Sequence, residues 1–326
     1  MGAPSTLGAA GVRVLVTGAG GFIGSNLVRR LAGLGASVTA TSRRPGRLDE
    51  FATGYRFTAC DLRSLPQTRE LVESAQPQLV FHLAAQPDSN ENGNHLHAVV
   101  SHNVSATANL LDSLAELPGV ALVYGDSAKV YGNSGVPFRG EQRLEPLSSY
   151  AVSKQAAWGM IDVYRRVHGI QAVGLRPTLV YGPGQGFNLF TFLIAAIDGG
   201  RDEIALDGGV QTRDPLFIDD AVNAFIAAAM HCGVLNGRNL PIGGGREISV
   251  DDIARLTVRL LGGQQRVIAR PTSVRPTETQ RSWCDNAEIT QAIGWLPRTP
   301  LEVGIQQTAA AQRVTVESVT DRKEKV

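Results

Sequence analysis

Short apolar runs alternate with amphipathic segments along the first half of the chain. Runs with the length of buried strands lie at 12–16, 36–41, 55–59, 79–83, 120–124 and 172–175. Apolar residues at helical spacing lie between them, most clearly at 22–34, 99–117 and 149–167. This alternation predicts an α/β fold with a doubly wound parallel sheet of the Rossmann type. Ligands in such sheets bind beyond the carboxyl ends of the strands.

After Pro177 the alternation loosens. Helical spacing returns at 189–197, 217–230, 249–261 and from about 301. We therefore expect a dinucleotide-binding domain over 12–178, to which 216–242 returns, and a smaller, mixed α/β substrate domain over 179–312. The flanking residues 1–11 and 313–326 are expected to form flexible tails.

The first strand and helix enclose a glycine-rich turn, Gly18-x-x-Gly21-x-x-Gly24. Strand, glycine turn and helix in this order are typical of a dinucleotide-binding unit. The glycines let backbone N–H groups approach a pyrophosphate at the helix N-terminus, where the helix dipole favours negative charge. The alternative is a tight βα turn with a structural role alone.

Composition narrows the function classes. The 326 residues are 43% hydrophobic, and the formal net charge is +1, so bulk charge gives no reason to expect nucleic acid or a membrane surface as partner. The three cysteines, Cys60, Cys232 and Cys284, fit no metal-ligand spacing. We expect a cytoplasmic protein with reduced thiols and no metal site.

A proton-transfer site is indicated by residues that follow the strands. Ser127 follows the run at 120–124, and Tyr150 and Lys154 are four apart, so a helix places them on one face. A lone Tyr-x-x-x-Lys is common on helix surfaces, but here it follows a dinucleotide turn and a serine in the order that carbonyl reduction requires. Tyr150 is expected to exchange the proton, Ser127 to hydrogen-bond the substrate oxygen, and Lys154 to hold the nicotinamide ribose.

The expected chemistry predicts the direction in which the pKa of Tyr150 is shifted. Free tyrosine has a pKa of about 10. The Lys154 ammonium and the positive nicotinamide ring should favour the phenolate and lower the pKa of Tyr150. General acid–base catalysis of this kind contributes about 10²–10⁴-fold.

At this point the sequence resembles the extended short-chain dehydrogenase/reductase family, which contains nucleotide-sugar epimerases, dehydratases and reductases. The resemblance covers about 12–312. It rests on TGAGGFIG at 17–24, CDLRS at 60–64, FHLAAQ at 81–86, NVSATANLL at 103–111, YAVSK at 150–154, LRPTLVYGPG at 175–184, RDPLFIDDAV at 213–222 and GWLPRTPLEVGI at 294–305.

The resemblance implies further site residues. Phe22 and Ile23 belong to the glycine turn, and Asp61 and Leu62 would lie near the adenine. The cofactor would be lined by Leu83, Ala84, Ala85 and Asn103, and Pro177 would lie beside the nicotinamide. Relatives hold the substrate diphosphate through an asparagine and two arginines, whose places are taken here by Asn188, Arg213 and Arg275. The alternative for each of these three is a loop or surface residue with no role in binding.

The end of the second strand decides the expected cofactor. NAD-dependent relatives usually carry an acid there, which binds the ribose 2′-hydroxyl. This chain has Ser42, followed by Arg43 and Arg44, and guanidinium groups can bind a 2′-phosphate. The sequence therefore favours NADP, with NAD as the alternative. The alternative is that these basic residues form a solvated turn that contacts no cofactor.

Two departures from the family pattern narrow the reaction. Sugar-nucleotide 4,6-dehydratases carry Asp-Glu directly after the serine, whereas this chain has Ala128-Lys129. Many epimerases have asparagine at the place of Leu179. We therefore expect NADPH-dependent reduction of the 4-keto group of a nucleotide-linked 6-deoxyhexose.

Two other functions stay open. One is an NAD-dependent nucleotide-sugar 4-epimerase, and the other is a dinucleotide-sensing protein without catalysis. Members of the family commonly form homodimers through a four-helix bundle, which here would join the helices at 99–117 and 149–167.

Overall fold

A parallel sheet forms the centre of the larger lobe. The computed structural model describes residues 11–50, 54–87, 95–270 and 276–323. Within them the sheet has seven strands in the order β11-β6-β5-β4-β1-β2-β3, each parallel to its neighbours. These are β1 (Arg13–Thr17), β2 (Ser37–Ser42), β3 (Tyr55–Ala59), β4 (Leu79–His82), β5 (Ala121–Gly125), β6 (Gln171–Pro177) and β11 (Asn239–Ile242). The order confirms the doubly wound Rossmann sheet.

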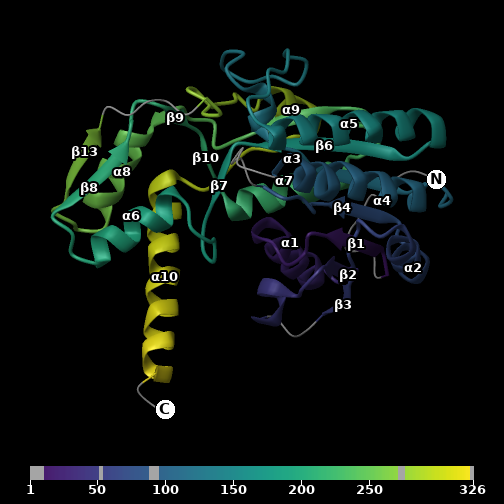
Figure 1. Cartoon of the computed structure of the whole chain (residues 1–326), viewed down its shortest axis with the longest axis horizontal. Coiled ribbons are helices and arrows are strands. Elements are labelled where there is room, and N and C mark those ends of the chain that lie inside the picture. Colours follow the sequence, from purple (N-terminus) through teal and green to yellow (C-terminus); the bar gives the residue numbers. More distant parts are fainter. Residues whose placement is uncertain (1–10, 51–53, 88–94, 271–275, 324–326) are drawn as a thin grey trace.

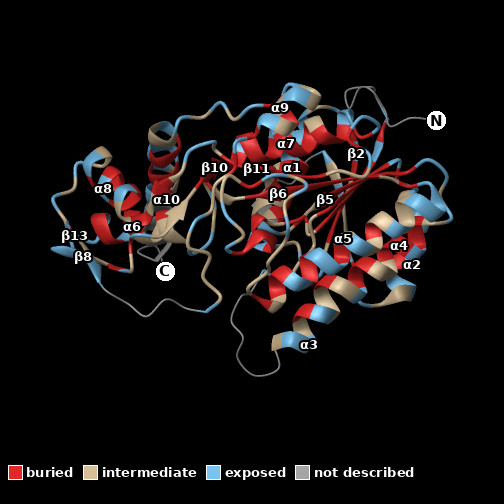
Figure 2. Cartoon of the chain, turned by 90° about the horizontal axis from the view of Figure 1, so that it is seen from above, coloured by how far each residue is buried: buried red, intermediate tan, exposed pale blue. Residues whose placement is uncertain are grey.

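Helices cover both faces of this sheet (Figure 2). One face packs against α2 (Leu65–Ala75), α4 (Ala106–Leu114) and α5 (Ser149–His168), and the other against α1 (Phe22–Gly33) and α7 (Ile218–Met230). The alternation of β1 explains the two cores, because Val14 and Val16 join the first and Leu15 joins the second. Strands buried on both faces read as continuous apolar runs, and this made them recognisable in the sequence.

The long helix predicted at 99–117 is interrupted. It consists of α3 (His95–Val99), the π-helical segment η2 (Val100–Ser105) and α4, and the N–H of Ala106 reaches back five residues to the carbonyl of Ser101. The widened turn contains Asn103, whose side chain accepts from Gln86 N–H at 2.7 Å and donates to Ser153 Oγ at 2.9 Å. Helical periodicity does not show such an insertion, which is often found at functional sites.

A smaller lobe of helices and short strands lies beside the sheet (Figure 1). It contains α6 (Leu189–Asp198), α8 (Val250–Leu260), α10 (Leu301–Lys323) and the parallel pair β8 (Glu203–Asp207) and β13 (Arg266–Arg270). Short ladders connect the lobes, β7 (Leu179–Tyr181) with β10 (Pro215–Phe217) and β9 (Thr212–Arg213) with β12 (Ile248–Ser249). The remaining elements are η1 (Gly46–Glu50), η3 (Ala128–Tyr131) and α9 (Ala287–Ile293). The mixed α/β second lobe is as predicted, although its short strands were not.

The two lobes share one buried cluster, which runs from β1 and α1 into α6 and α8, so the central sheet and not the core marks the division between them. The segment 216–242 contributes α7 to one face of the sheet and β11 to its edge. We therefore propose the domain division expected from the sequence. Residues 313–323 differ from the expected flexible tail, because α10 continues to Lys323 and Arg313 donates to Asp198 of α6 at 2.6 Å. Among the described helices, none is long and apolar enough to cross a membrane.

Candidate active site

The glycine turn after β1 is shaped by close backbone contacts. Gly18 has a φ of +66°, and a Cβ there would lie 2.6 Å from the backbone N of Ala84. A Cβ at Gly24 would lie 2.3 Å from the carbonyl oxygen of Gly18. Gly21 caps α1 without any side-chain hydrogen bond, so the helix N-terminus presents N–H groups to an anion. Only glycine fits at Gly18 and Gly24, and the turn has the shape that a pyrophosphate needs.

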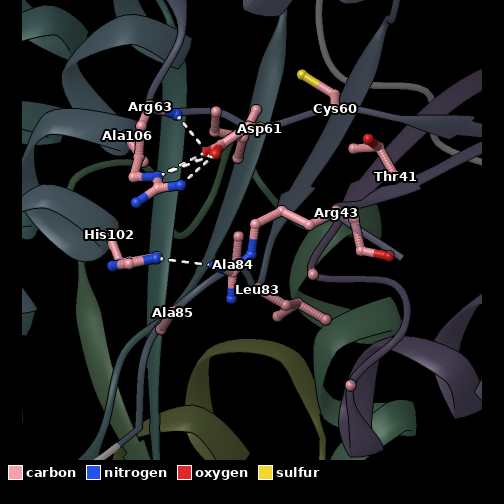
Figure 3. Close-up of a pocket in the computed structure, with 14 residues that line it drawn as sticks. Thr41, Arg43, Cys60, Asp61, Arg63, Leu83, Ala84, Ala85, His102 and Ala106 are labelled. Atoms are coloured by element: carbon pink, nitrogen blue, oxygen red, sulfur yellow. Dashed lines mark hydrogen bonds and ion pairs between the residues drawn. The ribbon is translucent and has the colours of Figure 1, made fainter. Parts of the chain in front are cut away.

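A cavity of about 250 Å³ opens beside this turn, at the carboxyl ends of β1, β2 and β3 (Figure 3). The structure brings the following predicted cofactor residues together around it: Gly18, Gly21, Ser42, Arg43, Asp61, Leu62, Leu83, Ala84 and Ala85. Thr41, Cys60, Arg63, His102 and Ala106 complete the lining and were not predicted. These residues fit an adenosine and its ribose.

Eight predicted cofactor residues lie outside this lining, and Gly24, Tyr150, Lys154 and Pro177 are four of them. Phe22 and Ile23 are the first residues of α1, and Arg44 is exposed, its carbonyl accepting from the Ser42 hydroxyl. Asn103 is buried and bonded to Gln86 and Ser153, which gives it a structural role in the π-helical turn. Of the two predicted arginines, Arg43 therefore reaches the cavity and Arg44 does not.

Charges in the cavity are distributed unevenly. Arg43 Nη1 lies 3.0 Å from His102 Nε2, and Asp61 and Arg63 form an ion pair at 2.5 Å (Figure 3). The hydrogen bond from Arg63 lowers the pKa of Asp61 to about 2, with a smaller contribution from the Arg43 charge. The strand end itself carries Ser42 and no acid. Of the two guanidinium groups that line the cavity, the one of Arg43 directly follows the end of β2.

Ser127, Tyr150 and Lys154 meet beyond the carboxyl end of β5. Ser127 is the N-cap of η3, and its hydroxyl lies near enough to Tyr150 to lower the pKa of the phenol. Tyr150 lies in the first turn of α5, which Ser148 caps by accepting from Ala151 N–H at 3.2 Å. Lys154 follows one turn later, is 1% exposed, and holds Nζ 4.1 Å from the centroid of the Tyr124 ring. Two oxygen groups and a buried ammonium are thus in place for proton transfer.

The direction expected for the pKa of Tyr150 is wrong for the chain alone. This pKa is raised to about 12: burial is the largest cause, the charge of Asp126 acts in the same direction, and the Ser127 hydroxyl opposes them. Lys154 is not among the groups that shift it, and burial lowers the pKa of Lys154 itself to about 8. The sequence could not show that α5 begins inside the protein, where the charged forms of both side chains lose their hydration.

A second cavity, of about 540 Å³, lies between the lobes. It contains four predicted residues, Ser127, Pro177, Asn188 and Arg213. The unpredicted lining includes Ala128, Lys129, Thr178, Leu179, Phe187, Leu189, Thr277, Glu278, Thr279 and Ser282. Because Ser127 borders it, this cavity is where a sugar would meet the catalytic groups. Arg275 lies outside the described residues.

The two polar residues expected at the diphosphate already have partners. Arg213 pairs with the carboxylate of Glu278 and donates to the carbonyl of Thr279 at 3.0 Å. Asn188 forms a capping box at the start of α6, accepting from Thr191 N–H at 2.9 Å. Arg213 can exchange a carboxylate for a phosphate, whereas the cap gives Asn188 a structural role in any case.

Comparison with known proteins agrees with this geometry. A family model described as the NAD dependent epimerase/dehydratase family matches residues 14–243. The UDP-glucose 4-epimerase of Mycolicibacterium smegmatis is 31% identical, over 91% of this chain and 97% of its own length. A dTDP-4-dehydro-6-deoxy-D-allose reductase from a Streptomyces species is 28% identical, over 94% and 97%. Among solved structures, a UDP-glucuronic acid 4-epimerase from Bacillus cereus, in complex with UDP-glucuronic acid and NAD, has a TM-score of 0.85 and 25% identity, over 93% and 99%.

Proposed function

The chain belongs to the NAD-dependent epimerase/dehydratase family, and on that premise we propose that it interconverts the two C4 epimers of a nucleoside-diphosphate sugar. It is an NAD(P)-dependent nucleotide-sugar enzyme of the extended short-chain dehydrogenase type. The observation that carries the finer proposal is the position of Ser127, which lies beside Tyr150 and borders the cavity between the lobes. The names of the epimerase relatives support the choice of reaction.

Each residue of the site has a separate role in the proposed reaction. The dinucleotide, when bound, supplies reversible hydride transfer at C4 of the sugar. Tyr150 takes the proton of the C4 hydroxyl during oxidation and returns it during reduction, while Ser127 hydrogen-bonds the same oxygen. Lys154 lies one helical turn after Tyr150 on α5, and its buried ammonium would hold the nicotinamide ribose of a bound cofactor. Because the same cofactor regains its starting state in each cycle, the enzyme needs no added coenzyme.

A second candidate, NADPH-dependent reduction of a 4-keto sugar, is favoured by one observation. The end of β2 carries Ser42 and Arg43 where an acid would hold the ribose of NAD, and both residues line the cofactor cavity. An NADP-binding enzyme suits net reduction. The candidates are separated by incubating the enzyme with UDP-sugars without coenzyme, and with a 4-keto-6-deoxy sugar nucleotide and NADPH.

Arg213 is proposed to bind the substrate diphosphate. Arg213→Ala should weaken binding of a nucleoside diphosphate by about 1.5–3 kcal/mol, because a charge-assisted hydrogen bond to phosphate is lost. Glu278→Gln is the matched variant, since it frees the guanidinium from its carboxylate and should leave binding unchanged or tighter. Calorimetry with UDP measures both. Equal losses in the two variants would mean that the pair only supports the fold.

The proposed partner besides substrate is a second copy of the chain. On the faces of α3, η2 and α5 the structure leaves exposed apolar side chains, namely Leu96, Val100, Val152, Val163 and Val167. The leucines Leu110, Leu111 and Leu114 of the predicted helix at 99–117 are fully buried against the sheet and do not belong to this face. An apolar helical face of this kind supports the proposed four-helix bundle.

Disruption of that face should produce a monomer. Val152→Glu combined with Val163→Glu places two charges on the face, and light scattering should then give the mass of one chain instead of two. Val234→Glu, at a residue that is 65% exposed and follows α7, is the control and should stay dimeric. A wild-type protein that is monomeric at micromolar concentration would contradict the proposal.

A cytoplasmic location is likewise proposed, in keeping with three free and buried cysteines.

A further inference from the structure

A buried carboxylate lies directly beside the catalytic serine. Asp126 follows β5, and its side chain is 1% exposed. One carboxylate oxygen accepts from Ser127 N–H at 2.8 Å. The other accepts from Arg176 Nε at 3.2 Å and from Asn239 Nδ2 at 2.6 Å. A charge removed from water in this way is stable only when it is paired and fully hydrogen-bonded, as it is here.

The partner of this carboxylate is itself fixed from several sides. Arg176, on β6, donates from Nη1 to the hydroxyl of Tyr131 at 2.9 Å and to the carbonyl of Gly140 at 3.1 Å. Its guanidinium carbon lies 5.1 Å from the centroid of the Tyr131 ring. The position of Asp126 is therefore set by β5, β6, β11 and η3 together, and the carboxylate cannot swing away from the site.

Asp126 acts electrostatically on both catalytic side chains of α5. Its charge raises the pKa of Tyr150 in the same direction as burial, and it raises the pKa of Lys154 against the effect of burial. Other charged or titratable groups also face this pair. Lys129 Nζ lies 5.9 Å from the centroid of the Tyr150 ring, Tyr124 stands over Lys154, and His82 of β4 lies 5.7 Å from Tyr124. Asp126 is the acid whose charge reaches both members of the pair.

We propose that Asp126 is a positioning residue, which fixes Ser127 beside Tyr150 through its hydrogen bond to the Ser127 N–H and places a buried negative charge next to the Tyr150–Lys154 pair. The proposal rests on Tyr150 as the proton carrier, and it is independent of whether the sugar is epimerised or reduced. The carboxylate keeps the proton on the phenol and the ammonium until a substrate and a positively charged nicotinamide enter the site. It thereby opposes premature formation of a buried phenolate.

Asp126→Asn tests the charge with little change in shape. The amide oxygen can still accept from Ser127 N–H, and Asn239 can turn its own amide, because its Oδ1 has no hydrogen-bond partner in the described structure. Loss of the negative charge should lower the pKa of Tyr150 by about one unit. In oxidation of the sugar, where Tyr150 accepts the proton, the acid limb of the pH dependence of kcat should move to lower pH by that amount; in net reduction, where Tyr150 donates the proton, the alkaline limb should move instead. Ultraviolet titration of tyrosinate, after subtraction of the same titration for Tyr150→Phe, should shift equally and needs no substrate.

Asn239→Ala is the matched control, since it removes a neutral donor to the same carboxylate oxygen. It should lower activity without moving that limb. If Asp126→Asn does not fold, the double variant Asp126→Asn, Arg176→Gln removes the buried pair as a unit, and its tyrosinate titration should shift in the same direction. An Asp126 variant that loses activity while both that limb and the titration stay in place would overturn the proposal. If no sugar substrate is found, that result counts against the proposed function. The role of Asp126 is then tested by the tyrosinate titration, which needs no substrate.

Discussion

Tyr150→Phe is expected to reduce turnover by about 10²–10⁴-fold, the range that general acid–base catalysis contributes. The substitution removes the one hydroxyl that can exchange a proton with the sugar oxygen, and it leaves the ring in its buried place on α5. Coenzyme affinity should change little, because the cavity beside the glycine turn is built from other residues. Steady-state kinetics and a coenzyme titration on the same preparation measure both quantities.

Tyr164→Phe provides the control on the same helix. Its hydroxyl donates to the carboxylate of Asp112 at the surface, so its loss should leave turnover within about two-fold of wild type. Turnover of Tyr150→Phe above about a tenth of wild type would remove this residue from the proton-transfer step.

The second prediction with a large expected effect is the preference of the protein for NADPH over NADH. NADPH should bind more tightly than NADH by about 1–3 kcal/mol, because Ser42 does not repel a 2′-phosphate and Arg43 can pair with it in a partly exposed cavity. Ser42→Asp combined with Arg43→Asn should reverse the preference, since an acid accepts the ribose hydroxyls and repels the phosphate. The chemistry takes place at the other end of the cofactor, so this preference does not by itself decide between epimerase and reductase.

Fluorescence titrations of both coenzymes measure the ratio. Arg44→Asn is the control, because that side chain is exposed and lies outside the cavity lining, and it should leave the ratio unchanged. A wild-type protein that prefers NADH would mean that the basic turn is only solvated. The reductase candidate would then lose the observation that favours it.

The central part of the site could be predicted because its residues follow a rule of topology. In a doubly wound sheet the residues after the strands share one edge, so the glycine turn and Ser127 had to meet. Asp61, Leu83 and Ala84 also follow strands, but it was the family resemblance that named residues there as part of the cofactor site. The start of α5 does not directly follow a strand, since η3 and a loop separate it from β5, and the motif YAVSK was needed to place Tyr150 and Lys154.

What depends on tertiary contacts could not be predicted. Burial of the first turn of α5 reversed the expected shift in the pKa of Tyr150, and burial depends on the packing of the whole lobe. The bond between Arg213 and Glu278 joins residues 65 positions apart. Asp126 could have been recognised in the sequence, because it is an acid that directly follows a buried strand. Its partner follows from strand register, because Gly125 pairs with Leu175, next to Arg176.

Turnover without added coenzyme tests the proposed function most directly. The purified enzyme should be incubated with UDP-glucose and, separately, with UDP-glucuronate, and the products separated by chromatography and identified by mass and NMR. Dinucleotide released by denaturing the protein is measured on the same sample. The proposed epimerase should carry bound dinucleotide and convert one of these sugars to its C4 epimer with no coenzyme consumed. Absence of any epimer, together with consumption of one NADPH for each 4-keto-6-deoxy sugar nucleotide reduced, would contradict it and establish a reductase.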